Sequence, residues 1–278
     1  MNNNENNLID IKQVLRTKAP SLAKKIPSFL VNYLIRIVHQ DELNKIIQTY
    51  SKDDGVDFML KLIDYFQLTL HIIHEENIPL DTKKYIFACN HPLGGLDGIC
   101  LSALLGEKYE GNIRYLVNDL LLFIPNLRSI FVPINKHGAQ LKDNVKLINN
   151  TFASEHQIIT FPAGLCSRKR HGKIEDLEWQ PSFIKKAVQY KKDIVPVFFE
   201  GENSNFFYNL SRIRTKLGIK QNIEMLYLSD EMFKSKGKTF NIHFGKPIPW
   251  QTFDKSHKAN EWAHWMKQTV YKLNDIDI

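Results

Sequence analysis

Residues 85–105 read Tyr85-Ile-Phe-Ala-Cys-Asn-His91-Pro-Leu-Gly-Gly-Leu-Asp97-Gly-Ile-Cys-Leu-Ser-Ala-Leu-Leu105, and they indicate a strand, a turn and a helix in succession. The apolar run Tyr85–Cys89 predicts the strand, and the Pro-Leu-Gly-Gly segment predicts the turn. This turn brings His91 and Asp97 to the mouth of one strand-turn-helix unit. A histidine supported by an aspartate deprotonates a hydroxyl without a metal or a covalent nucleophile. In the alternative interpretation, Asp97 only caps the helix and His91 hydrogen-bonds locally.

From residue 85 onward, short apolar strands alternate with helices. Strands are predicted at Tyr85–Cys89, Ile113–Val117, Ser129–Ile134, Ile158–Phe161, Ile194–Phe199, Glu224–Leu228 and Thr239–Phe244. Helices are predicted at Asp97–Leu105, Ala139–Ser154, Pro181–Tyr190, Ser204–Leu217 and Ala259–Leu273. This alternation predicts an α/β domain with a largely parallel central sheet flanked by helices. Active sites of such sheets lie beyond the carboxyl ends of the strands, so the His91 turn and the Pro162–Gly164 turn are expected to face one cleft.

Residues 1–80 form an N-terminal helical segment in this interpretation, and residues 81–278 form the α/β domain. Apolar residues recur at helical spacing between Leu43 and Tyr50, and a second periodic run extends from Val56 to Ile73. Residues 26–38 are largely apolar, with Lys24 and Lys25 before them and Arg36 within. Two interpretations of this stretch carry equal weight: an amphipathic helix on a membrane surface, or a helix packed on the rest of the fold.

The chain has 278 residues and a formal charge of +7, from 37 basic and 30 acidic residues. Such a balance suits nucleic acid, an anionic membrane surface or an acidic carrier protein. The three cysteines, Cys89, Cys100 and Cys166, lack metal-like spacing and indicate a reducing compartment. The sequence shows no signal peptide and no apolar run of about 18 residues, the length that spans a bilayer. We therefore expect a cytoplasmic protein, soluble or peripheral on the membrane.

A second block repeats the strand-to-turn pattern and adds cations. It reads Thr160-Phe-Pro-Ala-Gly-Leu-Cys-Ser-Arg-Lys-Arg170 and leads into the densest basic cluster of the chain, Arg168, Lys169, Arg170, His171 and Lys173. Arginines suit bidentate recognition of phosphate or carboxylate groups. The alternative for such a run is a solvated surface loop. Two further blocks are Ser129–Lys136 and the buried strand Ile194–Gly201.

With these four blocks in this order, residues 80–250 resemble the phospholipid/glycerol acyltransferase family, also called the HxxxxD acyltransferases. His91 and Asp97 match the catalytic histidine and aspartate of that family. Phe161-Pro-Ala-Gly164, with Ser167 and Arg168, is similar to its Phe-Pro-Glu-Gly-Thr-Arg-Ser acceptor-binding block. Ser129–Lys136 resembles its Ile-Phe-x-x-Arg block, and Val195-Pro-Val197 resembles its last strand.

Several departures from the family pattern point to a subset. Five residues separate His91 from Asp97, where most members have four, and this spacing is typical of the hemolysin-like members. Ala163 replaces the usual glutamate, Cys166 replaces an arginine, and Asn135 or Lys136 stands where the Ile-Phe-x-x-Arg block has its arginine. These changes remove groups that hold glycerol phosphate. The subset resembles enzymes that O-acylate lyso-aminolipids, and the resemblance implies that Arg168 or Lys169 pairs with a headgroup carboxylate.

The resemblance implies acyl transfer from a thioester of acyl carrier protein or coenzyme A to a lysolipid hydroxyl. His91 is the expected base, Asp97 holds its tautomer, and the Gly94-Gly95 turn presents N–H donors to the oxyanion. The resemblance implies that six residues of the second block bind the acceptor: Phe161, Pro162, Gly164, Ser167, Arg168 and Lys169. No metal or cofactor is expected, and the cysteines are spectators, with Cys166 the one to watch. Candidates for an acyl tunnel are Leu120–Phe123, Phe198, Phe199, Phe206 and Phe207, although most of these are expected to be core residues.

Three other enzyme classes lack their motifs in this chain. A zinc hydrolase needs a His-Glu-x-x-His motif, a serine hydrolase a Gly-x-Ser-x-Gly elbow and a nucleotide-binding protein a P-loop, and none of these occurs. A 1-acylglycerol-3-phosphate acyltransferase remains an alternative acceptor assignment. A non-enzymatic basic module that binds membrane or nucleic acid is the alternative of another class. We expect an acyltransferase on the inner face of the membrane, with no nucleic-acid partner.

Overall fold

The computed structural model describes residues 9–117, 119–134, 141–170 and 172–275. Its centre is a seven-stranded sheet in the order β1-β9-β8-β2-β5-β3-β4. The strands are β1 (Thr69–Ile73), β2 (Ile86–Cys89), β3 (Ile113–Val117), β4 (Phe131–Pro133), β5 (Gln157–Thr160), β8 (Ile194–Phe199) and β9 (Thr239–Phe244). All neighbours are parallel except β8 and β9. The predicted α/β fold with a largely parallel sheet is therefore confirmed.

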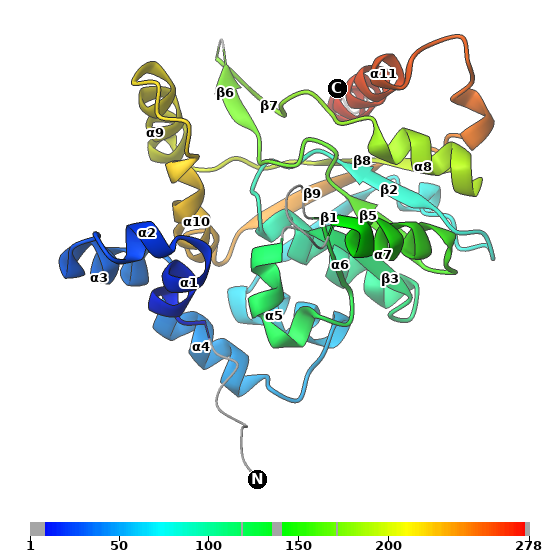
Figure 1. Ribbon diagram of the computed structural model, residues 1–278. Helices are drawn as coiled ribbons and strands as arrows, with labels where there is room; N and C mark the ends of the chain where they lie inside the picture. Colours follow the sequence, from blue (N-terminus) through cyan, green and yellow to red (C-terminus); the bar gives the residue numbers. More distant parts are fainter. Residues whose placement is uncertain (1–8, 118, 135–140, 171, 276–278) are drawn as a thin grey trace.

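Helices cover both faces of the sheet (Figure 1). One layer contains α4 (Gln40–Thr49), α5 (Val56–Phe66) and α6 (Leu96–Lys108), and the other contains α7 (Leu141–Ala153), α8 (Ser182–Tyr190) and α11 (Ala259–Lys272). Neighbouring residues of one strand pack against different helix layers, since successive side chains of a strand point to opposite faces of the sheet. Phe87 and Cys89 belong to the α6 side, whereas Ile86 and Ala88 belong to the α8 side.

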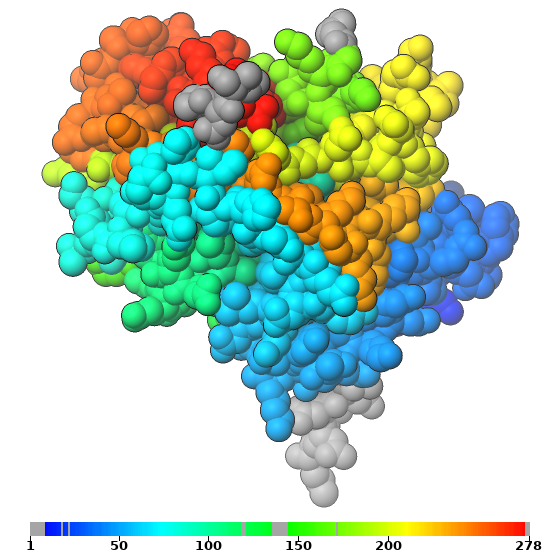
Figure 2. Space-filling model, turned by 180° about the vertical axis from the view of Figure 1, so that it is seen from behind, coloured from blue at the N-terminus to red at the C-terminus, as the bar shows by residue number. Residues whose placement is uncertain are grey.

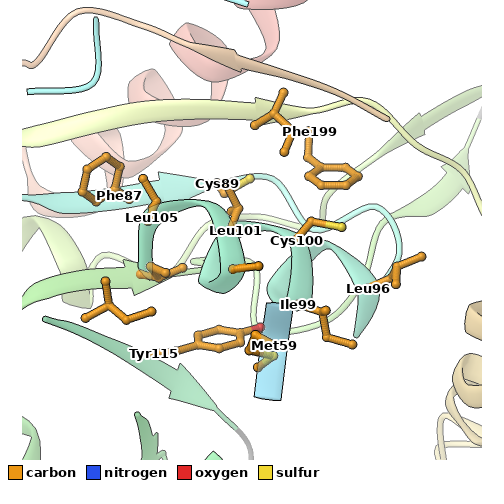
Figure 3. Close-up of a cluster of buried hydrophobic side chains, with 14 of the residues drawn as sticks. Met59, Phe87, Cys89, Leu96, Ile99, Cys100, Leu101, Leu105, Tyr115 and Phe199 are labelled. Atoms are coloured by element: carbon orange, nitrogen blue, oxygen red, sulfur yellow. The ribbon is translucent and has the colours of Figure 1, made fainter. Parts of the chain in front are cut away.

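Helix α6 is buried along most of its length, which fixes the start of the helix where Asp97 lies. Figure 3 shows Leu101 and Leu105 of this helix beside Phe87 and Cys89 of the sheet. Tyr115 of β3 leaves no room for a side chain at position 98, because a Cβ on Gly98 would collide with the tyrosine ring. Helix and sheet therefore approach each other closely at the residue that follows Asp97.

The N-terminal segment contains α1 (Ile11–Lys18), α2 (Pro20–Ala23) and α3 (Ser28–Ile37) before α4 and α5. The helical prediction is wrong for residues 69–73, which form strand β1 beside β9. Gln67 ends α5 in the left-handed conformation, with a φ of 51°, and β-branched residues follow. The predicted boundary at residue 80 therefore does not coincide with an edge of the sheet.

The segment after β5 contains two elements that the sequence did not indicate and one that it placed wrongly. Strands β6 (Arg168–Arg170) and β7 (Lys173–Glu175) form a small antiparallel hairpin. The strand predicted at Glu224–Leu228 is wrong: residues Ile223–Tyr227 form the 3₁₀ helix η4, and α10 (Leu228–Phe233) follows. Helix α9 (Asn205–Lys216) packs against η4. Among the described residues, no α-helix combines the length and the hydropathy that a bilayer span requires.

Candidate active site

The site lies where three parallel strands end. Strand β2 stands between β8 and β5, so the loops that leave these three strands are neighbours. Asn90 fastens two of the loops, because its Nδ2 donates to the Phe199 carbonyl at 3.0 Å and its Oδ1 accepts the Phe199 N–H at 2.7 Å. The main chain of His91 is fastened to the third loop, because the Ser167 N–H donates to the His91 carbonyl at 2.7 Å. The two blocks predicted to face one cleft are therefore in direct contact.

His91 and Asp97 form a hydrogen-bonded pair, with Nδ1 and Oδ2 3.1 Å apart. Asp97 is fully buried, and its Oδ2 also accepts the N–H groups of Leu93 and Gly94 while its Oδ1 accepts that of Gly98. Helix α6 has Gly95 at its N-cap position and no side-chain cap. The alternative in which Asp97 only caps the helix is therefore wrong, because the carboxylate holds both the turn and the imidazole.

The surroundings of His91 raise its pKa above the ordinary value. Burial alone lowers the pKa of this imidazole, but the charge of Asp97, its hydrogen bond and the charge of Asp176 outweigh the burial, and Arg168 opposes them weakly. The side chain is 12% exposed. Because Nδ1 is bound to Asp97, Nε2 is the ring nitrogen that can face a ligand, and no described residue hydrogen-bonds to it. This arrangement suits a general base that takes a proton through Nε2.

The loop after β5 shapes one wall of the site. The Phe161 ring lies over the His91 ring, with centroids 4.3 Å apart, and contacts Tyr115 on its other side. Gly164 has a φ of +67°, which glycine adopts without strain, and its N–H closes the turn onto the Phe161 carbonyl. The Pro162 carbonyl accepts the Gln180 N–H. Of these predicted binding residues, Phe161 reaches the base, whereas Pro162 and Gly164 form the turn behind it.

Asp176 is a buried carboxylate that the sequence analysis missed. Its Oδ1 accepts the His91 main-chain N–H at 3.1 Å and the Ser167 hydroxyl at 2.6 Å, and its Oδ2 accepts the Trp179 indole N–H at 2.9 Å. Burial raises the pKa of Asp176, against these hydrogen bonds. Glutamates stand on both sides in the stretch Glu175-Asp-Leu-Glu178, so no sequence signal distinguished it. Ser167, which was predicted to bind the acceptor, therefore hydrogen-bonds to this carboxylate and to the main chain of His91.

Arg168 is not available to a substrate. The guanidinium is buried, donates to the Cys166 carbonyl at 2.6 Å and pairs with Oε1 of Glu224 at 2.8 Å. Glu224 is fully buried and forms a second ion pair, with Arg214 of α9. The expectation that Arg168 meets a headgroup is therefore wrong for this conformation, whereas Lys169 is exposed beside the start of α9. His171 of the same cluster and residues 135–136 lie outside the described residues.

The two glycines of the turn differ in what surrounds them. Gly94 has a φ of +85°, and a Cβ there would stand 2.7 Å from Leu228 at the start of α10. Its N–H donates to Asp97, so it is already used. Gly95 faces open space at the N-terminus of α6, and its N–H is not among the donors of Asp97. Of the predicted oxyanion donors, Gly95 alone keeps its N–H clear of this carboxylate.

The remaining predicted residues are core residues or surface residues. Burial raises the pKa of the Cys166 thiol to about 12, although Arg168 lowers it, so this thiol stays protonated. The aromatic residues proposed for a tunnel do not gather: Phe199 and Phe198 belong to opposite layers, Phe207 stacks under Arg168, and Phe206 is exposed. Within the described part of the chain, no cluster of three histidine, cysteine or acidic side chains is placed to hold a metal.

Comparison with known proteins places these residues in a family. The family described as Acyltransferase matches residues 13–278. A lyso-glycine lipid O-acyltransferase from Bacteroides thetaiotaomicron is 52% identical over 266 residues, which cover 96% of this chain and 97% of the relative. A protein of the same name from Phocaeicola vulgatus is 50% identical over 266 residues, which cover 96% of this chain and 95% of that relative. The solved structure of a 1-acyl-sn-glycerophosphate acyltransferase from Thermotoga maritima aligns with 78% of this chain and with 80% of its own chain. The sequence identity is 15% and the TM-score is 0.47.

These matches extend over nearly the whole chain and include both blocks that meet at the site. The family match and the two relatives confirm the resemblance that the His91–Asp97 turn and the Phe161–Arg168 block indicated, and both relatives carry the name lyso-glycine lipid O-acyltransferase. The chain belongs to the acyltransferase family and is an acyltransferase.

Proposed function

We propose that this acyltransferase moves a fatty acyl group from an acyl thioester to the hydroxyl of a lysolipid, and that the acceptor is a lyso-glycine lipid. The hydrogen-bonded His91–Asp97 pair carries the proposal for the chemistry, because Asp97 binds Nδ1 and leaves Nε2 as the ring nitrogen that can act as the base. The two relatives at 52% and 50% identity support the choice of acceptor. The thioester is borne by acyl carrier protein or coenzyme A, and the net charge of +7 suits an acidic carrier.

The proposed reaction uses His91 twice. Nε2 takes the proton of the acceptor hydroxyl while its oxygen attacks the thioester carbonyl, and Asp97 stabilises the imidazolium that forms. The tetrahedral intermediate then expels the thiolate, which takes the proton from His91 and leaves as a thiol. The new ester bond replaces the thioester bond, so no acyl-enzyme and no oxidant is needed. The protonated state of Cys166 fits this direct route.

The oxyanion needs donors that are already in place. We assign this role to the Gly95 N–H, which lies at the positive end of the 13-residue helix α6. We assign recognition of the headgroup carboxylate to Lys169, since it is exposed whereas Arg168, the other cation expected to meet the headgroup, is buried. We also propose that the reaction takes place on the inner face of the membrane, and the three free cysteines fit a reducing compartment.

A panel assay tests the proposal. Purified protein receives labelled acyl carrier protein or labelled acyl-CoA together with one lysolipid at a time, and the labelled lipid is identified. We expect transfer to a lyso-glycine lipid and its loss in His91→Ala, with an unchanged thermal unfolding curve. Transfer to lysophosphatidic acid alone would assign the glycerol phosphate acceptor instead. Undiminished transfer by folded His91→Ala would refute the base.

A further inference from the structure

Helix α3 presents apolar side chains to the solvent at one end of the molecule. Phe29 is 69% exposed, and Leu30 and Tyr33 are exposed beside it. Phe29 and Tyr33 are four residues apart, so they lie on one side of the helix. Most of α3 therefore makes little contact with the core, although Ile37 at its end is buried.

Helix α9 and the segment after it show a second apolar face. Phe206 and Ile213 are exposed on α9, and Leu217, at the C-cap, is 69% exposed. The spacing of seven and then four residues places all three on one side of the helix. The opposite side is buried through Phe207 and Ser211.

The two faces adjoin each other through η4. The Tyr33 and Tyr227 hydroxyls are 2.6 Å apart, and the Phe206 ring contacts the Tyr227 ring edge-on. Figures 1 and 2 show the N-terminal helices beside α9 and α10 from opposite directions. We name the combined face of α3, η4 and α9 the α3–α9 surface. Together with Leu217 and Ile219, which follow α9, it holds eight of the 15 large exposed apolar side chains among the described residues.

The sequence around this surface is strongly cationic. Residues 11–40 contain six lysines and arginines, residues 203–223 contain four, and neither segment contains an aspartate or a glutamate. The remaining residues carry 27 basic and 30 acidic side chains, so their formal charge is −3. The formal positive charge of the chain therefore lies in these two segments, in which Arg214 is the cation that is paired with Glu224 of η4.

We propose that the α3–α9 surface docks the protein on an anionic lipid bilayer, an inference that rests on the proposed function and names the membrane-binding elements. Exposed Leu and Phe beside exposed Lys and Arg match a bilayer interface, because anionic headgroups there lie directly above the hydrocarbon core. Nucleic acid offers anionic phosphates but no hydrocarbon layer in which Leu and Phe could insert. A second copy of the chain would bring like charges together.

The surface is physically joined to the active site. Arg214 of α9 pairs with Glu224 of η4, which pairs with Arg168 of the second block. Asn203, just before α9, donates to the Pro92 carbonyl in the His91 turn. The α3–α9 surface is therefore linked to the turn that carries His91, and we expect docking through α9 to bring the site toward the lipid that holds the acceptor.

The test is flotation of the purified full chain with vesicles of phosphatidylcholine, with and without about 30 mol % phosphatidylglycerol. The apolar variant is Phe29→Ser with Leu217→Ser, and its matched control is Leu80→Ser, a residue with the same 69% exposure outside the surface. The charge variant is Arg212→Glu with Lys216→Glu, and its control is Lys185→Glu on α8. All of these positions are exposed, and thermal unfolding checks that each variant is folded.

We expect the wild type and both controls to bind the anionic vesicles. The charge variant binds at least about 30-fold more weakly, since each cation near an anionic surface contributes about fivefold. The apolar variant binds at least about tenfold more weakly, because two large side chains no longer insert. Unchanged vesicle binding in both variants would overturn the proposal. Loss of binding to an oligonucleotide duplex in the charge variant alone, with vesicle binding intact, would assign the surface to nucleic acid.

Binding and catalysis are measured apart. Vesicle flotation requires no acyl transfer, so it tests membrane docking even if the protein acylates no lysolipid. A protein that binds vesicles but acylates no lysolipid would refute the proposed function and leave the docking proposal intact. With a short-chain acceptor dissolved as monomers, both variants should keep wild-type acyl transfer. Loss of that transfer in folded variants would show that the surface acts in the site rather than in docking, and it would overturn the proposal.

Discussion

Replacing Asp97 by asparagine tests how the site tunes its base. The carboxylate accepts four hydrogen bonds, three through Oδ2 and one through Oδ1. The less costly orientation of the amide leaves its carbonyl where Oδ2 stood and turns its NH₂ group toward the Gly98 N–H. The buried Gly98 N–H and the new NH₂ group then face each other without an acceptor, which costs at least about 1–3 kcal/mol of folding stability. The melting temperature should fall by about 2–8 °C.

The catalytic effect is larger and has a definite pH signature. At the observed separation of 3.1 Å between Nδ1 and Oδ2, the carboxylate stabilises the imidazolium by about 5 kcal/mol at an effective dielectric constant of about 20. Losing this interaction slows kcat by up to about 10⁴-fold. Losing the charge and the hydrogen bond of Asp97 also lowers the pKa of His91. Since the base works only when neutral, the acid limb of kcat/KM should move to lower pH.

The assay is the pH profile of kcat/KM for Asp97→Asn against the wild type, with Gly94→Ala as the matched control. Gly94→Ala disturbs the same turn without removing a charge, so its acid limb should stay in place. A lower kcat with an unmoved acid limb in Asp97→Asn would refute the electrostatic reasoning. Asp97 would then act only as a clamp on residues 93–98.

Three further variants probe the supports of the site. Asp176→Asn should slow kcat about tenfold, which corresponds to about 1.4 kcal/mol. The acid limb of kcat/KM should also move to lower pH, because the charge of Asp176 raises the pKa of His91, and an unmoved acid limb would contradict this reasoning. Gly94→Ala should lower the unfolding free energy by about 1–3 kcal/mol in urea, because of its positive φ and Leu228, whereas Gly95→Ala should cost less than about 1 kcal/mol. Glu224→Gln should cost about 3–5 kcal/mol, since two buried guanidinium groups lose their charge partner; a small loss would show that water reaches the pair.

The central part of the fold was predictable because it depends on local patterns. Strands β2, β5 and β8 are short apolar runs that end in turn residues, and parallel packing then brings the following loops to one edge. The contact between His91 and the second block follows from that rule alone. Strand β1 was missed because its apolar residues continue the helical run of α5, and only pairing with β9 distinguishes the two.

The roles of the cations could not be predicted from local sequence. Arg168 lies in a run of basic residues that is typical of a ligand-binding loop, yet its partner Glu224 is 56 positions away. The same partner explains the wrong strand prediction, since η4 turns Glu224 inward toward two arginines. Asp176 was missed for a related reason: its role depends on the His91 backbone, 85 positions away.

The charges at the site argue for an acceptor with a small anionic group held at the rim. Asp97 and Asp176 flank His91, and Arg168 is paired with Glu224, so this arginine is not free to meet an incoming anion. A phosphate, with up to two charges, is repelled more strongly by these carboxylates than a glycine carboxylate with one. The exposed cation Lys169 lies outside this interior, next to α9. Under the proposed function, a headgroup carboxylate bound by Lys169 would therefore lie away from the two carboxylates that flank the base.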